Sequence, residues 1–434
     1  MVNHFEYRDG ELFAEDVSVS EIAAAVGTPF YCYSTATLVR HYSLFTEALA
    51  TLDSGIYYSL KANSNLAVVR TLSELGAGAD IVSGGELKRA LTAGIASNRV
   101  VFSGVGKTDA EIEAALDAGI FQFNIESIPE LLAIDRLAVQ NDVIARVAVR
   151  VNPNVDAATH AKITTGTDQN KFGIAAPEVC EVCRQIDALP GVELVGLAMH
   201  IGSQLLDLTP FETAFAALRT MTKTLRGEGH RIDRLDIGGG LGIPYGQEET
   251  PPPAAYAEHV IRYFGDLNCH IMLEPGRLIA GNAGLMIAQV VYVKDTPTRR
   301  FVIVDAAMND LLRPSLYDAS HEIWPVTKTV ASDEVTPVDV VGPVCESGDT
   351  FEVDCMLPPL RTKDLIAFGS AGAYGAVMAS SYNSRPLIPE VLVNGQEFAI
   401  VRARPTLDDM LAYERFPAWF EDQRVAAERA GYGS

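Results

Sequence analysis

The sequence predicts an α/β plus all-β protein: a (β/α)8 TIM-like barrel with a second, C-terminal β-sandwich or β-barrel domain. Between Gly55 and Arg277, short apolar strands alternate regularly with helical patterns. Repeated strand–helix units form parallel sheets, and eight strands are the number that closes such a barrel. After Gly284 the pattern changes to short strands separated by turns, which is typical of an all-β domain.

The residues before the barrel are predicted to be rich in β-structure. The stretch 5–13 is typical of a β-hairpin, with Asp9-Gly10 at its tight turn. Ser34 and Thr35 can cap an amphipathic helix that runs to about residue 52. Between the hairpin and this helix we expect a short helix over 20–26 and a strand over 29–33.

The barrel strands are short apolar runs with a helical pattern in each interval. An open doubly wound sheet is the alternative, but its glycine-rich turn usually follows the first strand. Here the richest glycine turn follows the seventh strand, which favours the barrel. The expected strands span 55–60, 79–82, 99–103, 120–125, 145–151, 193–200, 233–237 and 270–274. The expected helices span 65–75, 84–93, 108–118, 127–140, 176–189, 209–228 and 254–266.

The second domain contains one clear hairpin signal, Asn394-Gly395. We expect a barrel domain over 28–284 and a β domain formed by 1–27 and 285–434, which the N-terminal hairpin joins. The expected strands of the β domain span 286–295, 301–305, 335–341, 350–354, 364–368 and 389–404, and a helical tail follows over 406–431.

Composition and charge limit the classes of partner. A net charge of −22 argues against nucleic acid and anionic membranes. No run of about 18 apolar residues suggests a transmembrane helix, and the first residues lack the pattern of a secretory signal. Six scattered cysteines suit a reducing cytoplasm. Cys180 and Cys183 lie within one helical pattern without a second pair, so no metal site is expected.

Lys61 directly follows the first predicted barrel strand, at the end of a sheet where a helix begins. In a barrel this rim carries the active site, and partial desolvation there can lower the pKa of a lysine and make it a nucleophile toward carbonyls. A surface lysine whose stem covers apolar residues is the alternative for any single lysine. The residues at the ends of the other strands therefore have to distinguish a nucleophilic lysine from a surface lysine.

Polar and glycine-rich residues follow several other strands of the barrel. Phosphate sites in barrels typically form after strands 7 and 8, and glycines there let backbone N–H groups approach an anion. A tight turn alone would explain a triple glycine about as well. A phosphate site beside a strand-end lysine suits pyridoxal 5'-phosphate, a phosphorylated carbonyl cofactor. The strand ends are Asp80 with Ser83-Gly-Gly-Glu86, His200-Ile-Gly-Ser-Gln204, Gly238-Gly-Gly-Leu-Gly242 and Glu274-Pro-Gly-Arg277.

Glu274 refines the expected chemistry. A carboxylate beside the pyridine nitrogen keeps it protonated, and the protonated ring stabilises a carbanion after bond cleavage. An arginine in this place would leave the ring a poorer electron sink, as suits a racemase. His200 could stack on the ring, although a histidine satisfied within the core is an equally good interpretation of that residue alone.

Eight motifs in family order make the chain similar to the diaminopimelate decarboxylases, pyridoxal-phosphate enzymes of the alanine racemase-like fold class. The resemblance runs from about Thr28 through Arg385. It implies a barrel plus a β domain, and a homodimer with active sites shared across the interface. The motifs are Tyr58-Ser-Leu-Lys-Ala-Asn63, Asp80-Ile-Val-Ser-Gly-Gly-Glu-Leu87, Lys171-Phe-Gly-Ile174, His200-Ile-Gly-Ser-Gln204, Gly238-Gly-Gly-Leu-Gly242, Glu274-Pro-Gly-Arg277, Cys345-Glu-Ser-Gly-Asp349 and Ala373-Tyr374-Gly375.

The resemblance also implies roles for single residues. Lys61 resembles the Schiff-base lysine, and His200 the ring-stacking histidine. Cys345 matches the residue that would protonate the carbanion from the partner subunit; water is the other candidate. The implied cofactor contacts are Lys61, Asp80, His200, Ser203, Gly238, Gly239, Gly240, Glu274, Gly276, Arg277 and Tyr374. The implied substrate contacts are Arg277, Arg313, Tyr317, Glu346 and Tyr374.

The implied reaction is decarboxylation of meso-2,6-diaminopimelate to L-lysine and carbon dioxide, the last step of lysine biosynthesis. The substrate end remote from the cofactor carries a carboxylate and an ammonium, which Arg313 and Glu346 match. A surface or interdomain ion pair is the alternative role for Arg313. A decarboxylase of ornithine, lysine, arginine or carboxynorspermidine, a racemase, and a non-catalytic pyridoxal-phosphate-binding relative are the other hypotheses.

Overall fold

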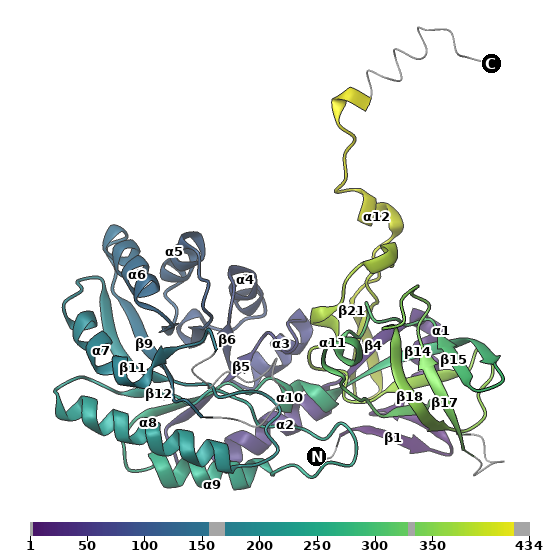
Figure 1. The fold of residues 1–434 in the computed structure, drawn as a ribbon, viewed down its shortest axis with the longest axis horizontal. Coiled ribbons are helices and arrows are strands. Elements are labelled where there is room, and N and C mark those ends of the chain that lie inside the picture. Colours follow the sequence, from purple (N-terminus) through teal and green to yellow (C-terminus); the bar gives the residue numbers. More distant parts are fainter. Residues whose placement is uncertain (1–2, 156–169, 329–334, 421–434) are drawn as a thin grey trace.

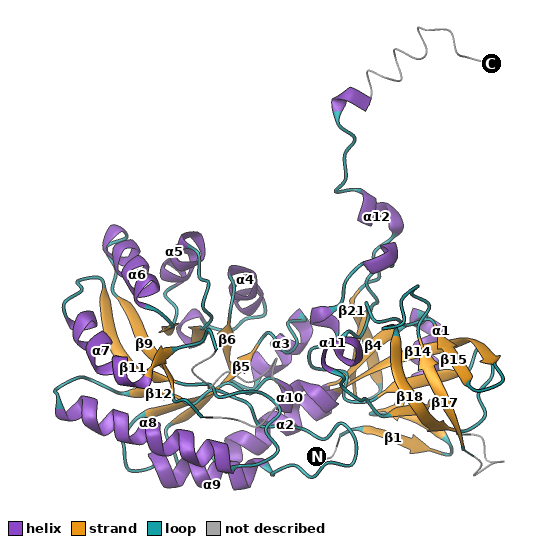
Figure 2. Ribbon diagram, in the orientation of Figure 1, coloured by secondary structure: helices purple, strands orange, loops and turns teal. Residues whose placement is uncertain are grey.

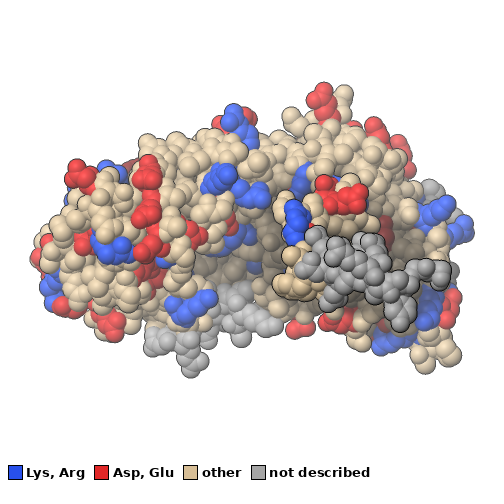
Figure 3. All heavy atoms as spheres, turned by 90° about the horizontal axis from the view of Figure 1, so that it is seen from above, with Lys and Arg blue, Asp and Glu red and all other residues tan. Residues whose placement is uncertain are grey.

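The computed structural model describes residues 3–155, 170–328 and 335–420. A barrel of strands and helices lies beside a β-rich domain, and residues 403–420 project away from both (Figure 1). None of the described helices is long and apolar enough to span a membrane. Acidic and basic side chains are interspersed over the face that Figure 3 shows.

Eight parallel strands close the predicted barrel. Neighbours pair in chain order, and β13 pairs with β5 while β8 pairs with β9, so the eight strands form a closed ring. All eight predicted strands are confirmed, with ends that shift by one or two residues. They are β5 (Ser54–Ser59), β6 (Gly78–Ile81), β7 (Val100–Phe102), β8 (Gln122–Ile125), β9 (Ala145–Asn152), β11 (Val192–Ala198), β12 (Arg234–Asp236) and β13 (His270–Leu273).

Helices surround the barrel on its outer side (Figure 2). The seven predicted helices are α3 (Leu66–Glu74), α4 (Gly84–Thr92), α5 (Asp109–Ala118), α6 (Ile128–Gln140), α7 (Val179–Asp187), α8 (Thr209–Gly227) and α9 (Pro253–Phe264). The ring is completed by α2 (Thr35–Ala48), which precedes the first strand and packs against both α3 and α9. The Ser34 hydroxyl caps α2 by accepting a hydrogen bond from the Thr37 N–H at 3.1 Å.

The β domain is built around a large mixed sheet in the order β18-β17-β15-β14-β4-β20-β21. Its strands are β4 (Phe30–Ser34), β14 (Gly284–Asp295), β15 (Arg300–Val304), β17 (Thr336–Val341), β18 (Thr350–Leu357), β20 (Glu390–Asn394) and β21 (Glu397–Arg402). Two further strands, β16 (Ile323–Pro325) and β19 (Leu365–Phe368), pair with each other, and β19 also pairs with β14. The predicted Asn394-Gly395 turn joins β20 to β21 with Gly395 at a φ of 59°.

The N-terminal residues pack on this second domain. A three-stranded sheet of β1 (Phe5–Arg8), β2 (Glu11–Ala14) and β3 (Val17–Ser18), with helix α1 (Val19–Val26), shares a core with β4 and β14 that includes Leu12, Ile22 and Leu285. Because β4 pairs with β14 and β20, we propose that the barrel domain begins with α2 rather than at residue 28.

The predicted helical tail is wrong in its described part. Only α12 (Leu407–Leu411) and a short turn of helix before residue 421 form, and the chain is not helical over 414–417. Pro417 explains the interruption, because a proline disfavours helical geometry in the preceding residue, here Phe416. The rest of the predicted tail, 421–431, lies outside the described residues.

Candidate active site

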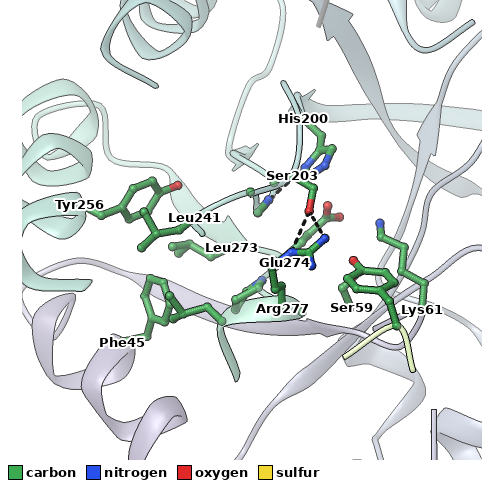
Figure 4. A pocket seen from close by; sticks show the side chains of 17 residues that line it. Phe45, Ser59, Lys61, His200, Ser203, Leu241, Tyr256, Leu273, Glu274 and Arg277 are labelled. Carbon is green, nitrogen blue, oxygen red and sulfur yellow. Dashed lines mark hydrogen bonds between the residues drawn. The ribbon is translucent and has the colours of Figure 1, made fainter. Parts of the chain in front are cut away.

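A cavity of about 800 Å3 opens at the carboxyl ends of the barrel strands and reaches the β domain. A smaller pocket adjoins it under the glycine turn, and Lys61, His200, Glu274 and Arg277 line both spaces. In Figure 4 these side chains converge from different strand ends on one space. The barrel and the β domain therefore both contribute to the site that the sequence predicted at this rim.

Lys61 follows β5 by two residues and lies beside a buried carboxylate. Its Nζ is 3.3 Å from Oδ2 of Asp80, which also accepts a hydrogen bond from the Ser59 hydroxyl at 2.6 Å. Burial lowers the pKa of Lys61, but Asp80, Tyr374 and Glu274 together raise it above its usual value. The predicted lowering of this pKa is therefore wrong for this structure, because the desolvated amine has carboxylate neighbours.

The glycine turn after β12 (Arg234–Asp236) lies against neighbouring backbone. Gly238 and Gly240 have φ angles of 69° and 112°, which favour glycine. A Cβ on Gly239 would lie 2.3 Å from the Glu274 carbonyl oxygen, and one on Gly276 would lie 2.8 Å from Cβ of Ala62. These positions admit no side chain, so the pocket is lined by bare backbone that a phosphate can approach.

His200 is held neutral above the same pocket. Its Nδ1 accepts a hydrogen bond from the Gly239 N–H at 3.2 Å, which leaves Nε2 as the protonated nitrogen. Burial, and then the positive charges of Lys61 and Arg150, hold the pKa of His200 well below its usual value. The imidazole can therefore present a flat, uncharged face to an aromatic ring.

Glu274 forms a buried acidic pair with Asp236. Burial, and then the negative charges of Asp236 and Asp80, raise the pKa of Glu274 well above its usual value. Asp236 is fixed by hydrogen bonds from the Asn124 side chain at 2.8 Å and the Gly238 N–H at 3.0 Å. A protonated ring nitrogen beside this pair would be a positive partner for the buried carboxylates. The residues present therefore fit a pyridinium.

Two buried guanidinium groups face the larger cavity. Arg277 and Arg313 are only 7% and 5% exposed. Their hydrogen-bond partners are neutral: Ser203 and Tyr245 for Arg277, and His321 for Arg313. Within the described part of the chain, no carboxylate forms an ion pair with either group. Buried charges are normally paired, so this cavity is suited to an anionic ligand.

The β domain supplies further cavity residues. Tyr317, at the end of α11 (Arg313–Tyr317), and Tyr374 both line the cavity. Tyr374 has a φ of 57°, its N–H donates to the Ala62 carbonyl at 2.8 Å, and its ring lies 4.7 Å from the Arg277 guanidinium carbon. The Asn63 side chain also donates to the Gly372 carbonyl at 2.9 Å, so backbone and side chain together join the lysine turn to the β domain.

Cys345 and Glu346 are not brought to this cavity by their own chain. Both are exposed, and Glu346 accepts a hydrogen bond from the Tyr382 hydroxyl at 2.9 Å. Their loop is shaped by Asp349, whose carboxylate accepts the N–H groups of Met308 at 2.6 Å and Val344 at 2.7 Å. The loop is thus preformed on the surface rather than part of the site within one chain.

Several site residues escaped the sequence reasoning. Tyr245 and Arg150 line the cavity, and His321 contacts Arg313 from behind it. Arg150 lies in the predicted strand 145–151, and successive side chains of a strand point to opposite faces of the sheet. This alternation could have marked Arg150 as pointing into the barrel. No signal identified His321, because its contact with Arg313 depends on how residues 313–321 fold back.

Comparison with known proteins agrees with this geometry. Residues 35–281 match the pyridoxal binding domain of the pyridoxal-dependent decarboxylases. A diaminopimelate decarboxylase of Zymomonas mobilis is 44% identical over 420 residues, covering 96% of this chain and 99% of that protein. The chain belongs to the diaminopimelate decarboxylase family of pyridoxal-dependent decarboxylases.

Solved structures show the same relationship. The diaminopimelate decarboxylase of Helicobacter pylori complexed with L-lysine has a TM-score of 0.88 and 44% identity, covering 91% of this chain and 98% of that one. The enzyme from M. jannaschii, in co-complex with L-lysine, has a TM-score of 0.91 and 35% identity, covering 96% and 98%. The predicted fold is confirmed, and as a member of this family the chain uses pyridoxal phosphate.

Proposed function

We propose that this chain is a carbon–carbon lyase that decarboxylates meso-2,6-diaminopimelate to L-lysine and carbon dioxide, the last step of lysine biosynthesis. The observation that carries the proposal is the pair of buried guanidinium groups, Arg277 and Arg313, without a carboxylate partner among the described residues. They face the same cavity as Lys61. The curated relatives named diaminopimelate decarboxylase support the same reaction.

The phosphate of the cofactor is assigned to the smaller pocket, and its ring to the adjoining part of the larger cavity, because Lys61, His200 and Glu274 line both spaces. Lys61 would be the amine that holds its carbonyl, while the backbone of Gly238–Gly240 and Gly276, together with Ser203, would hold its phosphate. Glu274 would partner the ring nitrogen, and His200 would cover the ring face. When bound, pyridoxal phosphate accepts the electron pair that the departing carbon dioxide leaves behind. The chain's own groups would position the scissile carboxylate and keep the ring nitrogen protonated.

The substrate is assigned to the larger cavity. Diaminopimelate carries an ammonium and a carboxylate at each end, and formation of L-lysine requires that the carboxylate is lost at the D-configured carbon. The L-configured end therefore remains intact, away from the cofactor. Arg313 can grip its carboxylate through two parallel hydrogen bonds. Tyr317, Tyr374 and Arg277 line the space between the two ends.

Other amino acids fit this cavity less well. The distal end of ornithine or lysine is a bare ammonium, which would lie against Arg313 and be repelled by a like charge. The buried charge of Arg313 would then also lack a counterion. A non-catalytic relative would need Lys61 to hold the cofactor, but neither Glu274 at the ring nitrogen nor Cys345 as a proton donor, so the presence of all three argues against it.

The complete site is proposed to need a second copy of the chain. Cys345 and Glu346 lie on an exposed, preformed loop, which suits residues that enter the cavity of a partner in a homodimer. Glu346 would then hold the distal ammonium, and Cys345 would return a proton to the substrate carbon. A cytoplasmic location is supported by the six cysteines, all of which are free thiols.

Release of carbon dioxide from four amino acids tests this function. The purified protein, supplied with pyridoxal phosphate, is assayed in parallel with meso-diaminopimelate, L-lysine, L-ornithine and L-arginine. We expect kcat/KM for diaminopimelate to exceed that of each other substrate by at least about 100-fold, the discrimination available from one buried charged pairing. Activity on ornithine alone would refute the assignment of Arg313.

A further inference from the structure

Arg313 is oriented by a histidine that does not reach the cavity. Its Nε donates to Nε2 of His321 at 3.2 Å, and Nδ1 of His321 lies 2.8 Å from the Gly369 carbonyl oxygen. Because a carbonyl oxygen can only accept, Nδ1 carries the proton and Nε2 is the acceptor. His321 is 3% exposed, so this arrangement is isolated from water.

A tyrosine completes the arrangement from the cavity side. The Tyr245 ring lies 4.5 Å from the guanidinium carbon of Arg313 and meets the His321 ring edge-on, with centroids 5.2 Å apart. Its hydroxyl accepts a hydrogen bond from the Arg277 guanidinium. One neutral side chain thus contacts both arginines and the histidine behind them.

The neutrality of these contacts has a chemical consequence. A buried arginine is usually oriented by a carboxylate, which would also cancel its charge. His321 fixes the direction of the Arg313 guanidinium through Nε, so the two terminal nitrogens and the full charge stay available to a ligand in the cavity that Arg313 lines. An anion in the cavity then meets a preoriented and unneutralised partner, which strengthens binding because little ordering remains to be done.

We propose that His321 is a positioning residue for substrate specificity: as a neutral acceptor, with Tyr245 packed against it, it aims Arg313 at the distal carboxylate of the substrate. This inference rests on the proposed function and adds to it the reason for a histidine at this place. Glutamate or aspartate at position 321 would orient Arg313 equally well but would compete with the substrate carboxylate for its charge.

Three substitutions separate orientation from charge. His321→Gln keeps a neutral acceptor near the Nε2 position, His321→Glu offers a charged acceptor of the same size, and His321→Leu offers none. We expect KM for diaminopimelate to stay within about threefold in His321→Gln but to rise about tenfold or more in His321→Leu. The rise should be greatest in His321→Glu, while kcat and the dissociation constant of pyridoxal phosphate change little. His259→Gln, on the outer helix α9, is the matched control.

Inhibitors provide a second measurement that a general loss of structure would not reproduce. L-lysine retains the distal carboxylate, so its inhibition constant should rise in parallel with KM across the three variants. Cadaverine (1,5-diaminopentane) has no carboxylate, so its inhibition constant should not rise in any variant, and it should fall in His321→Glu because the added carboxylate offsets the charge of Arg313 that repels an ammonium. The spectrum of 15N-labelled histidine should also show a neutral ring protonated at Nδ1, a signal absent from His321→Gln.

The outcomes that overturn the inference are distinct from failure of the proposed function. Equal KM values for His321→Glu and His321→Gln would show that neutrality is irrelevant, and an unchanged KM in His321→Leu would show that Arg313 needs no positioning. A loss of cadaverine or cofactor binding would assign His321 a merely structural role. If the unaltered protein does not act on diaminopimelate at all, the proposed function fails before any variant is compared.

Discussion

The amine of Lys61 lies 3.3 Å from the carboxylate of Asp80, and this carboxylate raises the pKa of an otherwise desolvated lysine. The lysine is therefore held as a cation at the mouth of the barrel until a ligand changes its surroundings. This pairing orients the amine toward the cavity, where Glu274 and His200 also lie (Figure 4).

Removal of the Lys61 amine should abolish covalent attachment of the cofactor. Borohydride treatment of the holoenzyme should fix pyridoxal phosphate to the unaltered protein, detected by mass spectrometry of the peptide around residue 61. Lys61→Ala should show no adduct and a loss of kcat of at least about 1,000-fold, because the amine that attaches the cofactor is lost. Lys88→Ala, an exposed lysine on α4, is the control and should retain the adduct. An adduct that persists in Lys61→Ala would assign the attachment to another residue.

Loss of the Glu274 charge should impair the reaction more than cofactor binding. In Glu274→Gln the side chain keeps its size but cannot keep a ring nitrogen protonated, so we expect kcat to fall by about 100-fold or more. The dissociation constant of pyridoxal phosphate, measured by fluorescence quenching, should change much less. Glu274→Asp retains the charge and should recover part of kcat. Equal kcat values in Glu274→Gln and the unaltered protein would contradict the role of the carboxylate.

Arg313→Ala should weaken substrate binding selectively. Loss of a charged, bidentate hydrogen-bonded contact corresponds to an increase in KM of about 10- to 100-fold. Arg313→Lys keeps the charge without the fork of donors, and its KM should lie between the two. Steady-state kinetics would show an unchanged KM if Arg313 instead forms only an interdomain contact.

Mixing two inactive variants should restore activity if the site is shared between copies. Lys61→Ala lacks the lysine side of the site and Cys345→Ala lacks the loop side, so a mixed dimer has one complete site. Random exchange of subunits in an equal mixture gives about a quarter of the full number of sites. Activity measured before and after co-refolding checks this, and no recovery despite exchanged subunits would place both residues in one chain's site.

Acid should destabilise the folded chain through its buried neutral histidines. Burial, and then the charge of Arg313, lower the pKa of His321 to about 3, while the unfolded chain binds the same proton near the ordinary value of about 6.5. Stability from this group is therefore complete above about pH 6.5 and is lost as the pH falls, by about 1.4 kcal/mol per pH unit. The midpoint of unfolding should fall less steeply between pH 6.5 and 4 in His321→Gln. Parallel slopes for the two proteins would show that His321 is not buried as a neutral ring.

The barrel could be predicted because its signals are local. Each strand is a short apolar run, and caps such as Ser34 are marked by neighbouring residues. The pairing of β4 with β14, which joins residue 33 to residue 284, leaves no such signal, because any apolar strand could take that place. The same holds for the helix α2, whose position in the ring is fixed only when the barrel closes.

The site could be predicted only as a set of residues at one rim. The motifs located Lys61 and Glu274, and the family resemblance implied Arg313, but the electrostatics of these residues depend on neighbours distant in sequence. Asp80 reverses the expected change in the pKa of Lys61, and His321 orients Arg313 through a fold of the chain that no pattern marks. The identity of the site residues could be predicted from the sequence. Their pKa shifts and orientations could not, because these depend on burial and on neighbouring charges.

The balance and handedness of the products test the central claim most directly. The protein, loaded with pyridoxal phosphate, is given meso-diaminopimelate; released carbon dioxide is quantified, and lysine is separated on a chiral column. The account predicts one L-lysine for each carbon dioxide, because the L-configured end is held by Arg313 while the other end reacts at the cofactor. Formation of D-lysine, or carbon dioxide release without lysine, would contradict it.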